Sequence, residues 1–119
     1  GIAVFIISDF HDIDSSCERD LSVLSRHSDI ELIHTYDPLE QRLPKHATLS
    51  VSDGESRLRV DTFDRRLLEK YEQDWKKFTE NLQRAATSSR IRSQSVSTEK
   101  AAEAHLIALF AAKQSRRLR

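Results

Sequence analysis

The sequence contains few of the residues from which several common functional sites are built. Its two glycines, Gly1 and Gly54, are too few and too far apart to form the glycine-rich loop that holds phosphates in nucleotide-binding sites. Its single cysteine, Cys17, excludes an intrachain disulfide and a zinc site made of several cysteines. A lone cysteine also fits a reducing compartment. These shortages exclude the common forms of nucleotide binding, disulfide chemistry and cysteine-based zinc binding.

Long apolar runs and a surplus of one charge are absent as well. The longest apolar runs are Ile2–Ile7 and Leu106–Ala112, and both are far shorter than the roughly 20 residues that a membrane-spanning helix requires. Nineteen Lys and Arg residues balance 19 Asp and Glu residues, so no overall field attracts nucleic acid. The basic end, Arg116–Arg119, follows a predicted helix, and we interpret it as solvated and favourable for the helix dipole. The sequence therefore predicts neither a membrane segment nor a nucleic-acid partner.

Length and the first residues bear on domain organisation. A chain of 119 residues has room for one small domain. It contains no methionine, and the pattern of a buried strand begins immediately after Gly1. We therefore expect residues 1–119 to be a single, partial domain from a longer protein.

The first part of the chain has the pattern of a parallel β-sheet. The continuous apolar run Ile2–Ile7 predicts a strand that is covered on both faces. Ser15 and Glu18 have the spacing of a capping box and predict the start of a short helix. Asp29–Tyr36 predicts a second strand, and the order strand, helix, strand implies a parallel crossover. The residues expected on the inner face of the helix are Cys17, Leu21 and Leu24.

A hairpin and a long helix are predicted next. Apolar and polar residues alternate on both sides of Asp53 and Gly54, which predicts a tight primed turn and a hairpin with one face on the core. A helix capped by Thr62 or Asp64 is expected to run to about Ser88. Its apolar residues recur at steps of three and four, and we expect this stripe to pack on the sheet rather than on a partner helix. The stripe consists of Leu68, Tyr71, Trp75, Phe78, Leu82 and Ala85.

The end of the chain predicts one more strand and one more helix. Arg90–Ser97 is polar, which suits a strand at a sheet edge, and Ser97 or Thr98 can cap the last helix. The apolar residues of that helix are Leu106, Ile107 and Phe110. Together the elements predict an α/β fold in three layers, a partial doubly wound sheet. It would contain mostly parallel strands, an antiparallel hairpin and three helices.

The segment after the first strand carries the strongest candidate for a functional site. Ligands in open parallel sheets bind at the carboxyl ends of strands, and three carboxylates and an imidazole lie within Asp9–Asp14. Such a group can hold a divalent cation through oxygen ligands. We predict Asp9 as a metal ligand. We interpret His11, Asp12 and Asp14 as solvated loop residues that favour the start of the following helix.

The Asp9–His11 segment also suggests an enzymatic alternative. A strand that ends in Asp-x-His resembles the first motif of calcineurin-like metallophosphoesterases, which use two metal ions. The further Gly-Asp and Gly-Asn-His motifs of that site are absent from this sequence. A divalent-metal hydrolase would therefore need its remaining ligands from outside these residues, and we predict no catalytic residue and no enzymatic activity. The other histidines do not follow that spacing, and they are His27, His34, His46 and His105.

Five motifs occur in order along the chain: Val4–Phe10, His34–Glu40, Leu43-Pro44, Val51–Gly54 and Asp61–Leu67. Together they resemble one bacterial family, the domain-of-unknown-function family fifty-eight. The resemblance implies the C-terminal half of a von Willebrand factor A-like fold, in a cytoplasmic protein that acts with a MoxR-type AAA+ ATPase and has no established enzymatic activity.

The same resemblance implies a role for Asp9. Factor A domains bind partners through a metal-ion-dependent adhesion site, and Asp9 is similar to the aspartate that follows the fourth strand of that fold. The Asp-x-Ser-x-Ser motif of the site is absent here, so Mg²⁺ or another divalent cation would need ligands from the rest of the protein. No cofactor is expected within residues 1–119. We expect a protein partner, and a homodimer through Ile2–Ile7, because this strand would become an exposed edge.

Overall fold

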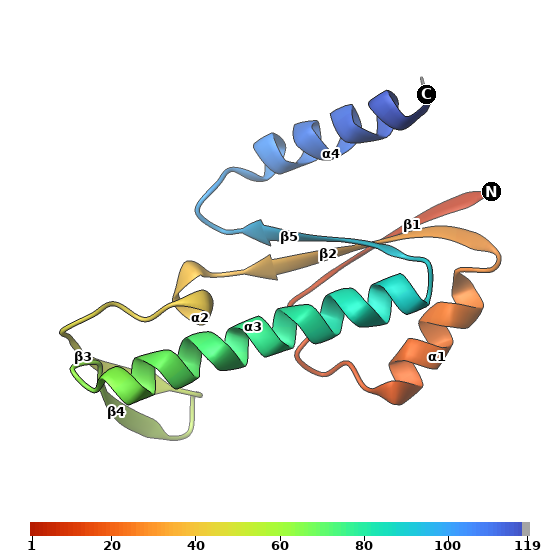
Figure 1. The fold of residues 1–119 in the computed structure, drawn as a ribbon. Helices are drawn as coiled ribbons and strands as arrows, with labels where there is room; N and C mark the ends of the chain where they lie inside the picture. The colour runs from red at the N-terminus through yellow and green to blue at the C-terminus, as the bar shows by residue number, and fades with distance from the viewer. Residues whose placement is uncertain (118–119) are drawn as a thin grey trace.

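The fold was taken from a computed structural model, which describes residues 1–117 and the side chains of residues 1–111 (Figure 1). Five strands and four helices succeed one another along this part of the chain. They are β1 (Ile2–Ser8), α1 (Ser15–Leu24), β2 (Ser28–Tyr36), α2 (Pro38–Gln41), β3 (Thr48–Ser52), β4 (Arg57–Asp61), α3 (Arg65–Ser88), β5 (Arg92–Ser97) and α4 (Ala102–Arg117). The predicted mixed α/β class is confirmed.

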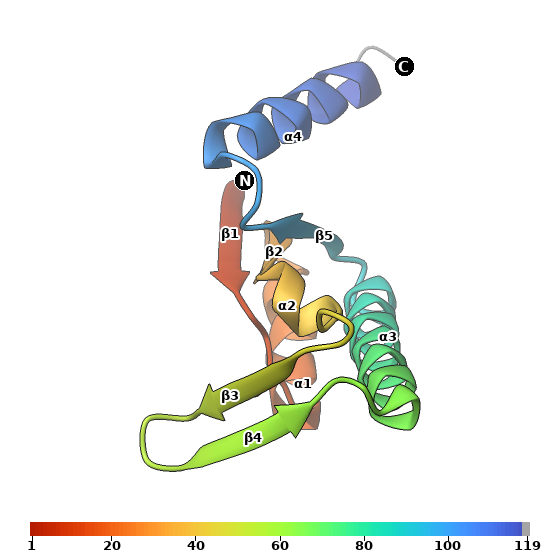
Figure 2. The ribbon, with the colours of Figure 1, turned by 90° about the vertical axis from the view of Figure 1, so that its left-hand side faces the viewer.

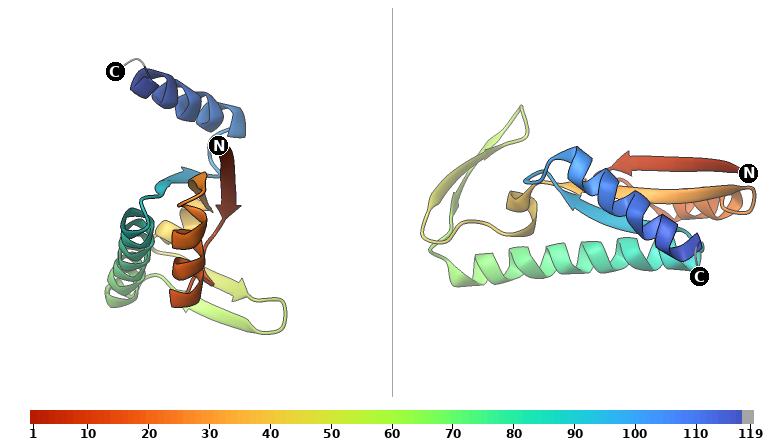
Figure 3. Two further views of the ribbon diagram at one scale, coloured as in Figure 1. Left: turned by 90° about the vertical axis from the view of Figure 1, so that its right-hand side faces the viewer. Right: turned by 90° about the horizontal axis from the view of Figure 1, so that it is seen from above.

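The main sheet contains three parallel strands in the order β1-β2-β5. In β1 and β2, Ile2 lies opposite Ser28 and Ser8 lies opposite His34. The sequence correctly predicted the two apolar strands, their parallel pairing and the position of the polar strand β5 at an edge. The prediction that Ile2–Ile7 is covered on both faces is wrong, since Phe5 and Ile7 are 40% and 65% exposed. Helices α1 and α3 lie on one side of the sheet and α4 on the other (Figures 1 and 3). The molecule therefore has the three predicted layers.

The core lies between the sheet and the pair α1 and α3. Side chains alternate along a strand, so Ile30, Leu32 and His34 of β2 face this layer, whereas Ile33 faces α4. The predicted stripe of α3 packs here, with Leu82 buried and Phe78 half-buried against the cluster. The buried cluster consists of Phe10, Ile30, Leu32, Leu82, Ala86 and Ile91.

Helix α1 begins differently from the prediction. Its N-cap is Asp14, whose carboxylate accepts a hydrogen bond from the Cys17 N–H at 2.8 Å. The predicted capping box of Ser15 and Glu18 is wrong, because Asp14 lies one residue earlier and is an equally good cap. The predicted inner face is wrong for two of three residues, since Cys17 and Leu24 are exposed and only Leu21 reaches the core.

The hairpin of β3 and β4 forms a separate two-stranded sheet that lies apart from the parallel strands (Figure 2). Its predicted core-facing side is largely in solvent, since Val51 is 48% and Leu58 is 66% exposed. The turn is also longer than the predicted primed turn, because residues 53–56 separate the strands and only Gly54 among them has a positive φ, of 98°. The Asp53 carboxylate closes this turn by accepting from the N–H groups of residues 55 and 56.

Two further differences concern the helices. The short helix α2 was not predicted, although Asp37, Pro38 and Glu40 form a complete capping box with proline at its start. Helix α4 begins at Ala102 rather than directly after Thr98. Of its apolar residues, Leu106, Ile107 and Phe110 are exposed, while Leu109 is buried.

Two further predictions concern the basic residues at the end of the chain and the absence of a membrane-spanning segment. The side chains of the basic residues 116–119 lie outside the described part of the chain. Among the helices within residues 1–117, none is both long and apolar enough to cross a membrane.

Candidate functional site

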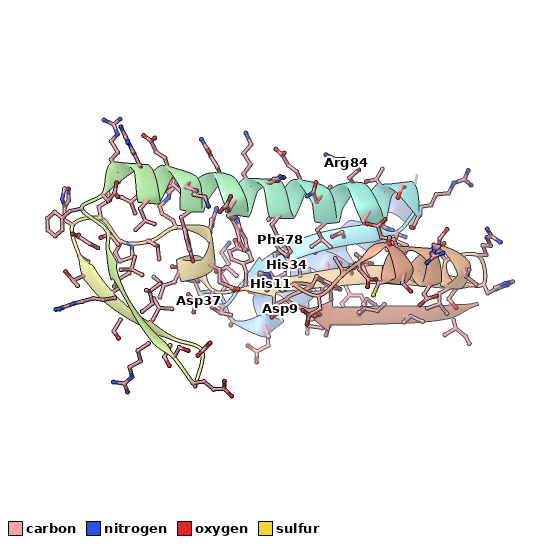
Figure 4. All side chains as sticks on the ribbon, turned by 90° about the horizontal axis from the view of Figure 1, so that it is seen from below. Asp9, His11, His34, Asp37, Phe78 and Arg84 are labelled. Atoms are coloured by element: carbon pink, nitrogen blue, oxygen red, sulfur yellow. The ribbon has the colours of Figure 1, made fainter. Side chains whose placement is uncertain are left out.

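Polar and aromatic residues from four segments, the loop after β1, the end of β2, α2 and α3, meet at the carboxyl ends of β1 and β2 (Figure 4). Asp9 and His11 follow β1, and Glu40 lies in α2, just after β2. Helix α3 runs past them and contributes Trp75 and Phe78. The position is the one that parallel sheets commonly use for ligands.

A strained turn sets the direction in which the chain leaves β1. Phe10 has a φ of 56°, a left-handed conformation that is uncommon for a residue with a side chain. Its ring is 8% exposed and belongs to the core, and this burial favours the strained backbone. The Asp9 carboxylate stays exposed at the strand end and accepts from the His11 N–H at 3.2 Å. The turn thus separates Asp9, which faces solvent, from His11, which turns toward α3.

His11 joins three segments of the chain. Its ring stacks on Phe78, with centroids 4.7 Å apart and planes 16° apart. Its Nε2 lies 3.2 Å from Glu40 Oε1. The prediction of a merely solvated loop residue is therefore wrong for His11. The prediction for Asp14 is confirmed, because this carboxylate caps α1, and the Cys17 N–H that it accepts lowers its pKa.

His34 is the most enclosed polar side chain of the site. It is 0% exposed, and its Nδ1 lies 3.1 Å from Ser95 Oγ. Its Nε2 has no hydrogen-bond partner among the described residues. Burial lowers the pKa of the imidazole, so His34 is held in its neutral form. Four aromatic rings surround it at centroid distances of 5.5–6.3 Å, those of Phe10, Tyr36, Trp75 and Phe78.

An open groove of about 330 Å³ lies beside these residues, between α2 and α3. The Tyr71 hydroxyl donates to the Leu39 carbonyl at 2.7 Å and fixes α3 against α2 at this point. Burial raises the pKa of Tyr71, so its hydroxyl keeps the proton that this bond requires. The groove is lined by His11, Glu40, Tyr71, Asp74, Trp75 and Phe78. Tyr71, Trp75 and Phe78 were predicted as part of the stripe that packs on the sheet. No pattern in the sequence linked them with the two carboxylates of the groove, Glu40 and Asp74.

The residues described do not assemble a metal site by themselves. Within residues 1–117, no group of three or more His, Cys, Asp or Glu side chains is placed to hold a metal ion. Asp9 could contribute one ligand, and both the adhesion site and the hydrolase alternative need others. The assignment of Asp9 as a metal ligand therefore stays a prediction about the whole protein.

The comparison with protein families identifies the chain's relatives. Residues 1–81 match the sequence model of the family described as Protein of unknown function DUF58, which is more than half of the 119 residues. The chain belongs to the DUF58 family. The DUF58 match covers β1 through most of α3, and so includes Asp9 and all residues that line the groove. No curated protein and no solved structure matches the chain.

Proposed function

We propose that this DUF58 chain is part of a non-catalytic, von Willebrand factor A-like interaction domain that acts with a MoxR-type AAA+ ATPase. The observation that carries the proposal is the outer edge of β1. This seven-residue apolar strand is the first of the sheet, with β2 on one side and no other strand within residues 1–117 on the other. Ile2 and Ile7 on this strand are 68% and 65% exposed. Such an edge is a template for pairing with another polypeptide.

An apolar groove extends the same surface. A hollow of about 270 Å³ lies between the sheet and α4, and Ile7, Ile33 and Leu106 are among its lining residues. Leu106, which lines it, and Phe110, which also lies on α4, are about half exposed. Extended apolar surface of this kind is typical of sites where proteins interact. The strand edge would supply main-chain hydrogen bonds, and the hollow would accept apolar side chains of the partner.

Changing one edge residue tests the proposal. We expect Ile7→Lys to weaken binding of the 119-residue chain to a purified MoxR-type ATPase roughly tenfold or more, because a charged edge residue opposes strand pairing. Without the ATPase, the same edge should pair two copies of the chain. Ile7→Lys should then shift the 119-residue chain from dimer to monomer in multi-angle light scattering.

The matched control is Val23→Lys. Val23 is an exposed apolar residue of α1, 53% accessible, and lies away from the strand edge. It should leave both ATPase binding and self-association unchanged. Absence of ATPase binding at micromolar concentrations would contradict the partner proposal. A monomer with the wild-type sequence, or equal effects of the two lysines, would contradict the role of the β1 edge.

The metal part of the proposal has its own test. In the whole protein, Asp9→Ala should weaken Mg²⁺ binding on the order of tenfold or more, because it removes a charged oxygen ligand. Isothermal titration calorimetry measures the affinity directly. Asp12→Ala is the matched control, since Asp12 is an exposed aspartate of the same loop. Equal Mg²⁺ affinities for the wild type and Asp9→Ala would remove Asp9 from the site.

A further inference from the structure

We infer that the groove between α2 and α3 binds an arginine side chain of the partner protein. This inference rests on the proposed interaction function and assigns a chemistry to a second surface of the domain. The groove volume of about 330 Å³ is at the lower end of the range for small-ligand sites, roughly 300–1,000 Å³. A single side chain rather than a large ligand is the occupant that suits it.

The walls of the groove are aromatic. Trp75 and Phe78 are half-buried neighbours on α3, with ring centroids 5.9 Å apart. Tyr36 packs on Trp75 at 5.2 Å and His34 at 5.5 Å, so the indole is held in place before any ligand arrives. A guanidinium group within about 6 Å of such a ring is attracted to its face. Preformed rings lose little conformational freedom on binding and so favour it.

The charge of the groove selects a cation. Its lining contains two carboxylates, Glu40 and Asp74, and neither a lysine nor an arginine. Glu40 is fixed by two contacts, His11 Nε2 on one oxygen at 3.2 Å and the Asp37 N–H on the other at 2.8 Å. An ionised carboxylate has about four acceptor positions, so further donors can bind there. The groove therefore joins a fixed negative charge to aromatic faces.

Asp74 is the carboxylate most available to a partner. Its side chain is 68% exposed, and its ion pair with Lys70 is long, at 3.8 Å. Exposed pairs of this kind contribute little stability, so a partner's cation can replace Lys70. Arginine suits the site better than lysine, because the planar guanidinium stacks on rings while it donates two parallel hydrogen bonds to a carboxylate.

Trp75 makes the inference directly measurable. It is the only tryptophan of the chain, so fluorescence excited selectively at tryptophan rather than at the two tyrosines reports on the groove. We would titrate the 119-residue chain with the peptide acetyl-Gly-Arg-Gly-amide and with its citrulline counterpart, which has the same shape and no charge, at fixed ionic strength. The arginine peptide should give a saturable change, and the citrulline peptide should bind at least about tenfold more weakly. The lysine peptide should fall between them.

Two variants separate groove binding from general charge attraction. Asp74→Asn should weaken arginine-peptide binding roughly two- to fivefold, the range expected for one exposed charge pair. Glu80→Gln is the matched control, because Glu80 also pairs with a lysine of α3, at 4.0 Å, but does not line the groove. Its affinity for the peptide should equal that of the wild type.

The outcomes distinguish this inference from the proposed function. Equal binding of the arginine and citrulline peptides, or unchanged arginine binding by Asp74→Asn, would overturn the arginine site. If that happens while the ATPase still binds, the interaction function stands and only the groove assignment fails. Selective arginine binding without ATPase binding would leave the groove assignment intact and remove the proposed partner.

Discussion

Acidification from about pH 8 to about pH 5 is expected to destabilise the chain through His34. Burial lowers the pKa of this imidazole from its ordinary value of 6.5, so the folded state takes up the proton less readily than the unfolded state. Below 6.5 the unfolded chain binds more protons, and the free energy of unfolding falls as the pH falls toward the folded pKa. One proton limits this loss to about 1.4 kcal/mol for each pH unit. Urea unfolding at several pH values measures it.

The surroundings of His34 explain the direction of the shift. Burial is its largest cause and favours the neutral ring. The charges of Glu40 and Asp9 favour protonation, whereas His11 opposes it. Only Nδ1 has a hydrogen-bond partner, Ser95, so a second N–H on Nε2 would have none within the described residues. The aromatic cage attracts a cation, but it does not replace the lost water.

The pH effect can be assigned by comparing two histidine variants. His34→Leu should abolish the difference between about pH 8 and about pH 5, whatever its stability at the higher pH. His27→Gln, which changes an exposed histidine, should retain the difference. The lowered carboxyl pKa values of Asp14 and Asp53 matter only below their ordinary value of 3.8, outside this window. An undiminished pH difference in His34→Leu would assign the acid sensitivity to another group.

The sequence carried enough information to predict the type of the longest apolar elements. The apolar run at Ile2–Ile7 predicted a strand and the helical period of the α3 stripe predicted a helix, and both elements occur. The run did not predict burial correctly, because neither face of β1 is fully covered. Polar β5 was correctly placed at an edge, because its side chains could not fill the middle of a sheet. These predictions succeed because the composition and period of a segment indicate which type of element it forms.

A pattern does not show what lies across from that face. The alternation in the hairpin was correct, but whether other elements of the chain cover Val51 and Leu58 depends on the path of the chain, and both are largely exposed. The cap of α1 was predicted wrongly for a different reason. Asp14 and Ser15 both cap helices well, and their neighbours do not decide between them.

The candidate site was predicted only in part. Its location after β1 follows from the rule for parallel sheets, and Asp9 lies there. The contact between His11 and Glu40 joins residues 29 positions apart, and Phe78 comes from a third element. No local pattern links these residues. The capping box in Asp37–Glu40 was a readable signal for α2, and with it Glu40 could have been placed beside the strand ends.

Replacing Leu32 with alanine is expected to cause the largest loss of stability from one substitution. Leu32 is 0% exposed at the centre of β2, opposite Ile6 of β1 and Ser93 of β5. Its side chain belongs to the cluster under α3, so truncation leaves a cavity that the sheet cannot close. The free energy of unfolding should fall by about 2–5 kcal/mol. Urea unfolding followed by Trp75 fluorescence and far-UV circular dichroism measures the loss.

Leu58→Ala is the matched control, because it makes the same chemical change in a side chain that is 66% exposed. It should lower the free energy of unfolding by less than about 0.5 kcal/mol. The two probes should report the same unfolding midpoint for Leu32→Ala, since Trp75 packs on the same face of β2 through His34 and Tyr36. Equal losses for the two leucines would contradict the assigned core. A Trp75 transition that precedes loss of secondary structure would instead show that α3 leaves the sheet first and that the groove opens with it.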